Sequence, residues 1–403
     1  MRMETFIRKS FGMKAHRVQE VLEEEARHVA VVERIPGRKL RCGECGLEVS
    51  PSENKRPERE WRDLSLRDRV LVIRYTPVRV RCPICGYRVE RVPWARKWQR
   101  VTDALAQWVA KLARHLSWAE VAELAGLDWK TVEGIVRRVV AEGLARRRWK
   151  PLHEIGIDEV SRRKGQRYLT LVYDLERGRL VWVGEGRERE TMERFFAWLG
   201  RRRARSIQVV CCDMWAAYLG AVEEHLPQAV VVFDRFHVVQ HLNRAVDDVR
   251  REAWRKLPEE EKSEFKRTRW LWLKNPWNLR PEEKARLGEL CRKNLPIVRA
   301  YYLKEAFQRF WDYLSRGWAE PYLHWWLGWA LRSRLAPFVR FARMIRDHLG
   351  GILAWTRLRV SNAALEGMNN KVKAISHRAY GFRKPETYMT AIWHGCGDLP
   401  LAL

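Results

Sequence analysis

The run Ile155-Gly156-Ile157-Asp158-Glu159-Val160 begins the segment whose order of elements decides the fold of this chain. Apolar residues alternate in it with small or polar residues, which is typical of a short β-strand. Ile155 and Ile157 therefore face one side of the predicted strand, and Asp158 faces the other. The first acid of interest thus points away from the apolar side.

Four further strands and two helices follow this run. Residues 168–173 and 180–183 are β-like and separated by turn residues, which predicts an antiparallel meander. Residues 190–199 predict an amphipathic helix, and residues 207–213 and 230–233 predict the fourth and fifth strands. A meander of three strands followed by helix, strand, helix and strand is the order of a ribonuclease-H-like fold.

A helix predicted near the end of the chain isolates a single acid. Its apolar residues fall on one face at three- and four-residue steps: Leu365, Met368, Val372 and Ile375. The opposite face carries the carboxylate of Glu366 among amides and cations. A metal ligand that faces an anionic substrate explains this isolation, although for this helix alone a solvated face explains it equally well. The neighbours of the acid that could support it or touch a substrate are Asn369, Asn370 and Lys373.

Three acids from two strands and one helix could share metal ions. Asp213 lies just past the apolar part of the fourth strand, where ligand sites form on such sheets. Together with Asp158 and Glu366 it can hold two divalent cations, which assist in-line phosphodiester displacement. Carboxylate oxygens suit Mg²⁺ or Mn²⁺. The pattern therefore predicts two such ions at these acids.

The chain carries a large excess of positive charge. It has 403 residues, with 78 Lys and Arg against 50 Asp and Glu, for a formal net charge of +28. A folded protein this basic is expected to bind a polyanion, and double-stranded DNA is favoured over an anionic membrane surface. The chain shows neither a long apolar run nor a secretion signal. We therefore expect a cytoplasmic, nucleoid-associated protein with no membrane partner.

Two cysteine knuckles lie within residues 1–100. Cys42 and Cys45 are separated by two residues and followed by glycine, and so are Cys82 and Cys85. Such turns point backbone amides at thiolates, and four thiolates close a tetrahedral zinc site. Disulfides are not expected in an intracellular chain. We therefore expect one structural Zn²⁺, and four unrelated reduced cysteines are the weaker interpretation.

Residues 101–150 predict three helices. Ser117 and Glu120 form a capping box for the second helix, which stops at Gly126, and Asp128 caps the third. A short helix, a glycine turn and a longer helix make a helix-turn-helix, although the same geometry also occurs as plain packing. The net charge favours DNA binding. The residues expected to face outward on the third helix and read DNA are Lys130, Thr131, Arg137 and Arg138.

Residues 240–355 lose the strand patterns and predict a helical insertion. Its long helical stretches contain ten tryptophans and are punctuated by prolines. We expect these indoles mainly in the core, and stacking on unpaired bases is the alternative for a minority of them. The apolar cluster that contains Trp325, Trp326 and Trp329 is assigned to the core.

The predicted fold class is therefore a multidomain α/β protein. A zinc-binding N-terminal module at residues 1–100 and a helix-turn-helix domain at residues 101–150 precede a ribonuclease-H-like mixed-sheet core. The core comprises residues 151–239 and residues 356–403, whose final helix carries the third acid. The all-α insertion at residues 240–355 interrupts it.

Taken together, the motifs resemble those of bacterial insertion-sequence transposases of the DDE type, in the ISL-three family, over almost the whole chain. The motifs that carry the resemblance are Ile157-Asp158-Glu-Val, Cys212-Asp213-Met-Trp-Ala-Ala-Tyr218, Asp234-Arg-Phe-His237-Val-Val, Glu366-Gly-Met-Asn-Asn-Lys371 and Arg378-Ala-Tyr-Gly-Phe-Arg383. The resemblance implies that Asp158, Asp213 and Glu366 are the catalytic metal ligands. Asp234 and His237 resemble an Asp-x-x-His signature, as either a substrate contact or a structural hydrogen bond.

The resemblance implies an enzyme that binds the inverted-repeat ends of an insertion sequence, cleaves the phosphodiester and joins the 3′ hydroxyl to target DNA. A non-catalytic DNA-binding regulator derived from a transposase is the alternative, and the intact acid triad argues against it. A stand-alone structure-specific nuclease is a third hypothesis. The zinc module and the helix-turn-helix argue against that one, because they favour recognition of a defined end. We expect a homodimer or larger assembly, because two ends must be paired.

Overall fold

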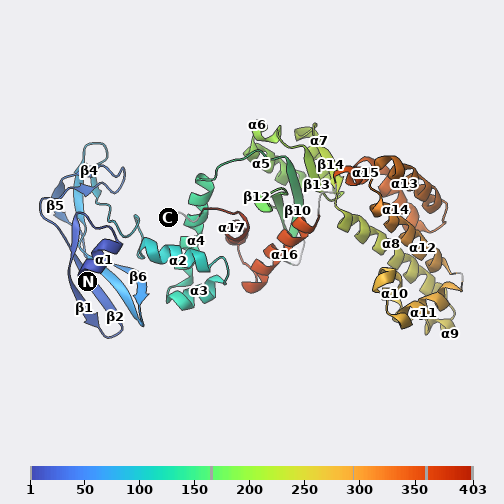
Figure 1. The fold of residues 1–403 in the computed structure, drawn as a ribbon, viewed down its shortest axis with the longest axis horizontal. Helices are drawn as coiled ribbons and strands as arrows, with labels where there is room; N and C mark the ends of the chain where they lie inside the picture. Colours follow the sequence, from blue (N-terminus) through green and yellow to red (C-terminus); the bar gives the residue numbers. More distant parts are fainter. Residues whose placement is uncertain (1, 164–166, 294, 359–361, 401–403) are drawn as a thin grey trace. The chain divides into compact units, whose positions relative to one another are not determined.

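A computed structural model of the protein describes residues 2–163, 167–293, 295–358 and 362–400. The chain divides into two compact units, Met1–Arg147 with Leu399–Leu403, and Arg148–Asp398. Both contain helices and sheets, so the protein is a mixed α/β structure (Figure 1). Among the described residues, none of the helices is both long and apolar enough to traverse a bilayer.

The first unit begins with a four-stranded sheet of order β1-β2-β7-β6. Its elements are α1 (Met3–Ser10), β1 (His16–Glu24), β2 (Arg27–Arg34), β6 (Arg59–Leu66) and β7 (Arg69–Tyr75). β2 and β7 pair in parallel, and β1 and β6 flank them as antiparallel partners. Trp94 closes the core of this sheet, with its ring edge-on to the rings of Trp61 and Tyr75.

Two small sheets carry the cysteine pairs at their turns. β3 (Leu40–Arg41) pairs with β4 (Glu48–Val49), and β5 (Pro51–Lys55), β8 (Val78–Cys82) and β9 (Gly86–Val89) form a three-stranded sheet. Gly46 and Gly86 follow the two pairs, each with φ of 73°. Glycine takes this left-handed conformation without a steric penalty, which explains its place after each pair.

Three helices follow in the first unit: α2 (Asp103–Leu112), α3 (Trp118–Ala125) and α4 (Trp129–Ala145). The predicted capping box of α3 is present, since the backbone N–H groups of Ser117 and Glu120 each donate to the other residue's side chain. Gly126 ends α3 with φ of 59°, and the Asp128 side chain caps α4. The predicted short helix, glycine turn and longer helix are therefore confirmed.

The second unit is built on a five-stranded mixed sheet of order β12-β11-β10-β13-β14. Its strands are β10 (Glu154–Arg163), β11 (Arg167–Asp174), β12 (Arg179–Glu185), β13 (Val209–Cys212) and β14 (Val230–Phe233). The first three form the predicted antiparallel meander, and β13 and β14 extend the sheet in parallel with β10. All five predicted strands are present in the predicted order.

Helices cover both faces of this sheet (Figure 1). Ile155 and Ile157 face a core shared with α5 (Arg189–Leu199) and α7 (Ala216–His225), beside the short α6 (Arg201–Ala204). On the other face α16 (Asn362–Arg378) packs on β10, and α17 (Pro385–Cys396) packs on β12. Leu365 of α16 fits against Gly156, where any Cβ would collide with it. The predicted apolar stripe of α16 is buried: Leu365, Met368, Val372 and Ile375.

A helical segment lies between β14 and α16. Its elements are α8 (Arg235–Lys256), α9 (Glu259–Lys262), α10 (Arg269–Leu273), η1 (Pro276–Asn278), α11 (Pro281–Cys291), α12 (Pro296–Gln308), η2 (Arg309–Asp312), α13 (Arg316–Leu331), α14 (Ala336–Asp347) and α15 (Leu349–Leu358). All of them except α9 and η1 contribute buried residues to one apolar core, which includes Phe233 of β14. The proposed borders of the insertion, after residues 239 and 355, both fall inside helices, in α8 and α15. The insertion is therefore joined to the core by continuous helices.

Tryptophan burial in this segment differs in part from the expectation. Trp272, Trp311 and Trp326 are buried, whereas Trp325 is 56% exposed. The two adjacent indoles of α13 point to different sides, because successive residues of a helix are about 100° apart. The assignment of the whole 322–329 cluster to the core is therefore wrong for Trp325. Other exposed indoles of the segment are Trp254, Trp270, Trp277 and Trp318.

Candidate active site and nucleic-acid interface

Three aspartates stand in a row where the parallel pairing of β10, β13 and β14 ends; Asp158 lies within β10, and Asp213 and Asp234 directly follow β13 and β14. The register of β10 and β13, continued two residues past its last pair, places Asp158 opposite Asp213. The register of β13 and β14, continued by one residue, places Asp213 opposite Asp234. The edge beyond the carboxyl ends of parallel strands is where ligands bind on open α/β sheets. The first two acids predicted from the sequence are thus neighbours, and Asp234 joins them.

Hydrogen bonds from two sides hold the Asp158 carboxylate. Its Oδ1 accepts from the backbone N–H of Glu159 at 2.6 Å, and its Oδ2 accepts from the side-chain amide of Asn369 on α16. The amide oxygen of Asn369 accepts from the Tyr173 hydroxyl at 3.1 Å. Burial raises the pKa of Tyr173, so its hydroxyl stays protonated as a donor. The polar face of α16 is therefore tied to the first acid.

His237 lies between two of the aspartates. Its Nε2 is 3.9 Å from Oδ1 of Asp158 and 3.8 Å from Oδ2 of Asp234. Both distances exceed a normal hydrogen bond, so the contacts are electrostatic, and a protonated imidazole would offset either carboxylate. The Asp234 side chain also caps α8 by accepting from the backbone N–H of Phe236 at 2.6 Å.

Burial makes two acids of this row, Asp213 and Asp234, hard to ionise. It raises the pKa of Asp213, where the backbone N–H of Trp215 acts in the opposite direction. It also raises the pKa of Asp234, where His237 opposes it. The charge of Asp158 raises both pKa values further. Buried acids that repel one another favour a cation among them.

Glu366 lies on the exposed side of α16, one helical turn before Asn369. One turn rises about 5.4 Å, so Glu366 is close to the residue that contacts Asp158. Asp158, Asp213 and Glu366 nevertheless do not form a ligand cluster: of the residues described, only cysteines place three or more ligand atoms within 4.8 Å of one another. Asn370 and Lys373 are also exposed on α16.

A cluster beside the aspartates was missed by the sequence reasoning. Arg187 lies 3.5 Å from the Glu159 carboxylate, and its guanidinium stacks over the rings of Tyr168 and Trp215 at 4.3 and 5.0 Å. Burial raises the pKa of Glu159, while Arg187 lowers it and the charges of the nearby acids raise it. Glu159 directly follows the predicted Asp158, which was an available signal. Arg187 lies in the β12–α5 loop and carries no local motif.

The four cysteines form one compact cluster. Their sulfur atoms all lie within 4.8 Å of one another, and those of Cys45 and Cys82 are 3.5 Å apart. The backbone N–H groups of Cys85 and Ile84 lower the pKa of the Cys82 thiol to about 7, whereas Cys45 raises the pKa of Cys85 to about 12. Tetrahedral zinc, with Zn–S bonds of about 2.3 Å, spaces its sulfurs about 3.8 Å apart. The cluster therefore fits such an ion in both size and donor type.

The predicted DNA-reading residues of α4 differ in exposure. Lys130 and Arg137 are exposed, and Thr131 is partly exposed. Arg137 donates to Glu133 one turn earlier at 2.8 Å. Arg138 is only partly exposed, and burial lowers the pKa of its guanidinium. Arg138 therefore exposes less of its side chain than Arg137 does, and the role of both in reading DNA stays a prediction.

Comparison with known proteins matches both parts of this chain. A family model described as a transposase matches residues 155–392, and one described as the helix-turn-helix domain of transposase family ISL3 matches residues 90–140. The transposase for insertion sequence element IS1001 of Bordetella parapertussis is 33% identical over 374 residues, which is 92% of each chain. The transposase for insertion sequence element IS1557 of Mycobacterium tuberculosis is 34% identical over 370 residues, covering 86% of this chain and 83% of that protein.

These matches define the class of protein as a transposase with a helix-turn-helix domain. More particularly, the chain belongs to the ISL3 family of insertion-sequence transposases. The resemblance inferred from the motifs is confirmed. The family implies DNA binding and transfer of polynucleotide strands.

Proposed function

We propose that the protein binds the inverted-repeat ends of an insertion sequence, cleaves the phosphodiester there and joins the freed 3′ hydroxyl to target DNA. The observation that carries this proposal is the row of Asp158, Asp213 and Asp234 where the parallel pairing of β10, β13 and β14 ends. Glu366 supports it, because it lies one turn from the residue of α16 that contacts Asp158. Numbered along the chain, the strands of the sheet run 3-2-1-4-5, which supports assignment of a ribonuclease-H-like core.

Asp158, Asp213 and Glu366 would hold two divalent ions, Mg²⁺ or Mn²⁺. Such ions supply activation of the attacking oxygen and stabilisation of the leaving oxygen. The donor set fits, since hard cations prefer carboxylate oxygens and the buried aspartates repel one another without a counter-charge. Glu366 has to approach the aspartates to complete the set.

Several neighbouring side chains would position these ligands. Asn369 orients Asp158 and is itself oriented by Tyr173. His237, within 4 Å of both Asp158 and Asp234, would help to position these two carboxylates. Through these contacts the protein itself would orient the Asp158 and Asp234 carboxylates before DNA binds.

The first unit would recognise the DNA end. Its cysteine cluster would hold one structural Zn²⁺, which leaves no open position for chemistry. α4 would enter the major groove and present Lys130, Thr131 and Arg137, with a smaller part for Arg138. A homodimer or larger assembly would form on DNA, because two ends must be held together.

The test uses the full chain and a labelled duplex that carries the inverted repeat from the borders of its element. With Mg²⁺ we expect cleavage at the repeat boundary and strand joining, and neither with a scrambled duplex. Specific binding without cleavage in Mg²⁺ or Mn²⁺ would replace this proposal with a DNA-binding regulator. Cleavage of branched DNA with no preference for repeats would indicate a structure-specific nuclease.

A further inference from the structure

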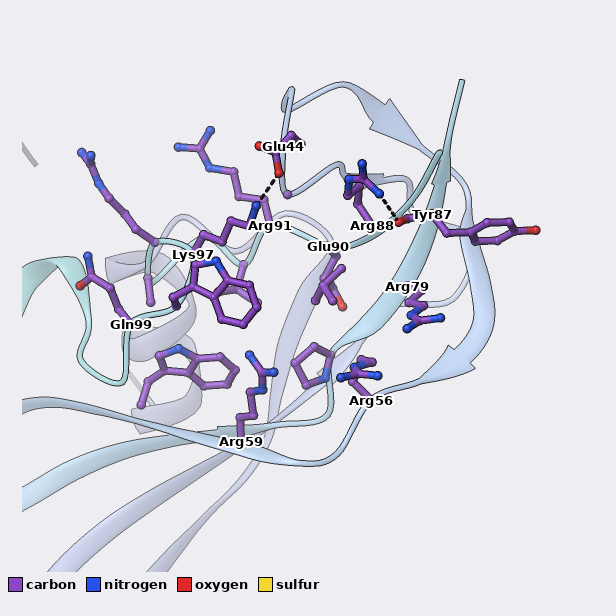
Figure 2. Close-up of a pocket in the computed structure, with 18 residues that line it drawn as sticks. Glu44, Arg56, Arg59, Arg79, Tyr87, Arg88, Glu90, Arg91, Lys97 and Gln99 are labelled. Carbon is purple, nitrogen blue, oxygen red and sulfur yellow. Dashed lines mark hydrogen bonds and ion pairs between the residues drawn. The ribbon is translucent and has the colours of Figure 1, made fainter. Parts of the chain in front are cut away.

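A cavity of about 570 Å³ opens in the first unit, and its lining includes Gly43 and Glu44, the two residues between Cys42 and Cys45. Strands β6, β8 and β9 line it, together with the loop that leads from β9 towards α2. In the view of Figure 2, Lys97 and Gln99 lie on one side, and Arg56, Arg79 and Arg88 lie on the other. Cavities that take small organic ligands have volumes in this range.

The lining of this cavity is strongly cationic. It contains six arginines and a lysine against two glutamates. Both glutamates are engaged: Glu44 accepts from Lys97, and Glu90 accepts from the Tyr75 hydroxyl at 2.6 Å and from the backbone N–H of Val78 at 2.9 Å. Five of the six arginines form no ion pair among the described residues: Arg56, Arg59, Arg79, Arg88 and Arg91; the sixth, Arg96, pairs with Glu142. The cavity therefore favours an anion with more than one contact point.

An indole stands at the same cavity. Trp98 is 82% exposed, and its backbone has φ of 66°, a conformation that bulky residues rarely adopt. Such strain persists where the surrounding structure enforces it, and it is common at binding sites. An exposed indole next to arginines is the combination that stacks on nucleic acid bases while phosphates are held beside it.

Gln99 adds a group that can hydrogen-bond to a base. Gln99 is only 7% exposed. Neither its side-chain amide nitrogen nor its amide oxygen has a hydrogen-bond partner among the described residues. A buried amide without partners is costly, and a ligand that supplies a donor and an acceptor removes the cost. The edge of a base, adenine above all, supplies both.

We propose that this cavity binds a nucleotide of the DNA that lies outside the duplex. Its base stacks on Trp98 and hydrogen-bonds to Gln99, and its phosphate contacts arginines such as Arg59 and Arg79. This inference rests on the proposed function, in which the same unit binds transposon ends. It adds a site for an unpaired nucleotide to the duplex recognition assigned to α4.

The experiment measures binding of the full chain, by fluorescence anisotropy without divalent metal, to three inverted-repeat duplexes. One is blunt, one carries a short single-stranded adenine extension, and one carries an abasic extension of equal length. We expect the adenine extension to tighten binding about tenfold over the other two, since stacking of a base is worth about 1–3 kcal/mol. Free deoxyadenosine monophosphate should compete only with the extended duplex.

Variants with matched controls locate the effect. Trp98→Ala should remove the adenine advantage, whereas Trp270→Ala, an exposed indole of the other unit, should keep it. Gln99→Leu should retain stacking but lose discrimination among the four bases. Arg79→Gln should weaken binding of the extended duplex, and Arg38→Gln, an exposed arginine outside the cavity, should not.

Equal affinity for blunt and extended duplexes, or an adenine advantage that survives Trp98→Ala, overturns the inference and leaves the proposed function standing. Failure of the proposed function would give a different result. If inverted-repeat and scrambled duplexes bind alike while the adenine advantage remains, the proposed function fails and the nucleotide site stands.

Discussion

The two candidate metal sites of this protein differ in how far the folded chain prepares them. The four cysteine sulfurs already lie within 4.8 Å of one another, whereas Asp158, Asp213 and Glu366 do not form such a group. Each cysteine pair belongs to one tight turn, so local backbone geometry sets most of its spacing. The acids come from two strands and a helix, and they repel one another. The comparison indicates that zinc at the cysteines would stabilise the fold of the first unit. The divalent ions at the acids would instead assemble the active site of the second unit.

The largest expected effect comes from removing one acid. Asp158→Asn keeps the shape but loses an anionic ligand, so we expect strand cleavage to fall by about three orders of magnitude or more. The measurement is single-turnover cleavage of an end duplex in Mg²⁺, with binding followed separately. Glu223→Gln, an exposed acid of α7, is the control and should cleave normally. Cleavage by Asp158→Asn would show that the site is not organised around this row.

Removal of one thiolate should affect the fold instead. Cys45→Ser leaves three ligands at a site whose zinc would stabilise the first unit, and structural zinc is worth about 10 kcal/mol or more in small domains. We expect no bound zinc by elemental analysis and loss of the unfolding transition of Met1–Arg147, while the second unit still melts cooperatively. Cys291→Ser, in α11, should change neither. If the wild-type protein contained no zinc and its stability were unchanged, the cysteines would not be a structural zinc site.

Asn369 tests whether α16 orients the first acid. Asn369→Leu removes the donor to Asp158, which should lower the cleavage rate about tenfold and leave end binding unchanged. Asn370→Leu is the matched control, because Asn370 is the exposed neighbour on the same helix. Excess Mn²⁺, which binds such ligands more tightly, should restore part of the rate in Asn369→Leu. Equal effects of the two variants would assign Asn369 to helix stability.

The stability of the second unit should depend on pH in a way that Mg²⁺ changes. Burial raises the pKa of Asp213 and Asp234, so the metal-free folded state binds protons more tightly than the unfolded chain. Its stability therefore falls as pH rises from the ordinary carboxyl pKa through the raised values. Since Mg²⁺ binds only the ionised acids, the rise in Tm that it causes should grow by a few degrees over the same range. Thermal melts with and without Mg²⁺ measure this, and an equal shift at every pH would contradict it.

The smallest expected effect concerns α4. Arg137→Gln should reduce the salt dependence of end binding by about one unit of slope if the side chain contacts a phosphate. Arg138→Gln should change it less, because Arg138 is partly buried. Affinity measured across a salt series compares the two variants. A larger effect of Arg138→Gln would mean that the helix rotates on binding DNA.

The sequence allowed prediction of features that local patterns encode. Alternation located the five strands of the second unit, and capping residues such as Ser117 and Asp128 located the helices of the first. Features set by packing were not accessible in this way. The exposure of Trp325 depends on which side of α13 the insertion covers, and Arg187 reaches Glu159 only through the folding of its loop. The acids were predicted by type and order, but the distance from Glu366 to the aspartates depends on how α16 packs.

One consequence follows from the way α8 begins. Its 22 residues make a rod about 33 Å long, whose first turn is anchored by the Asp234 side chain. The same aspartate lies next to Asp213 in the candidate active site. Asp234 therefore belongs both to the start of α8 and to the row of acids. Because α8 is long, a small tilt about its first turn would move its far end by several ångströms. In the same way, a displacement of the far end would shift the Asp234 side chain. The position of α8 and the position of the Asp234 carboxylate beside Asp213 therefore depend on the same side chain.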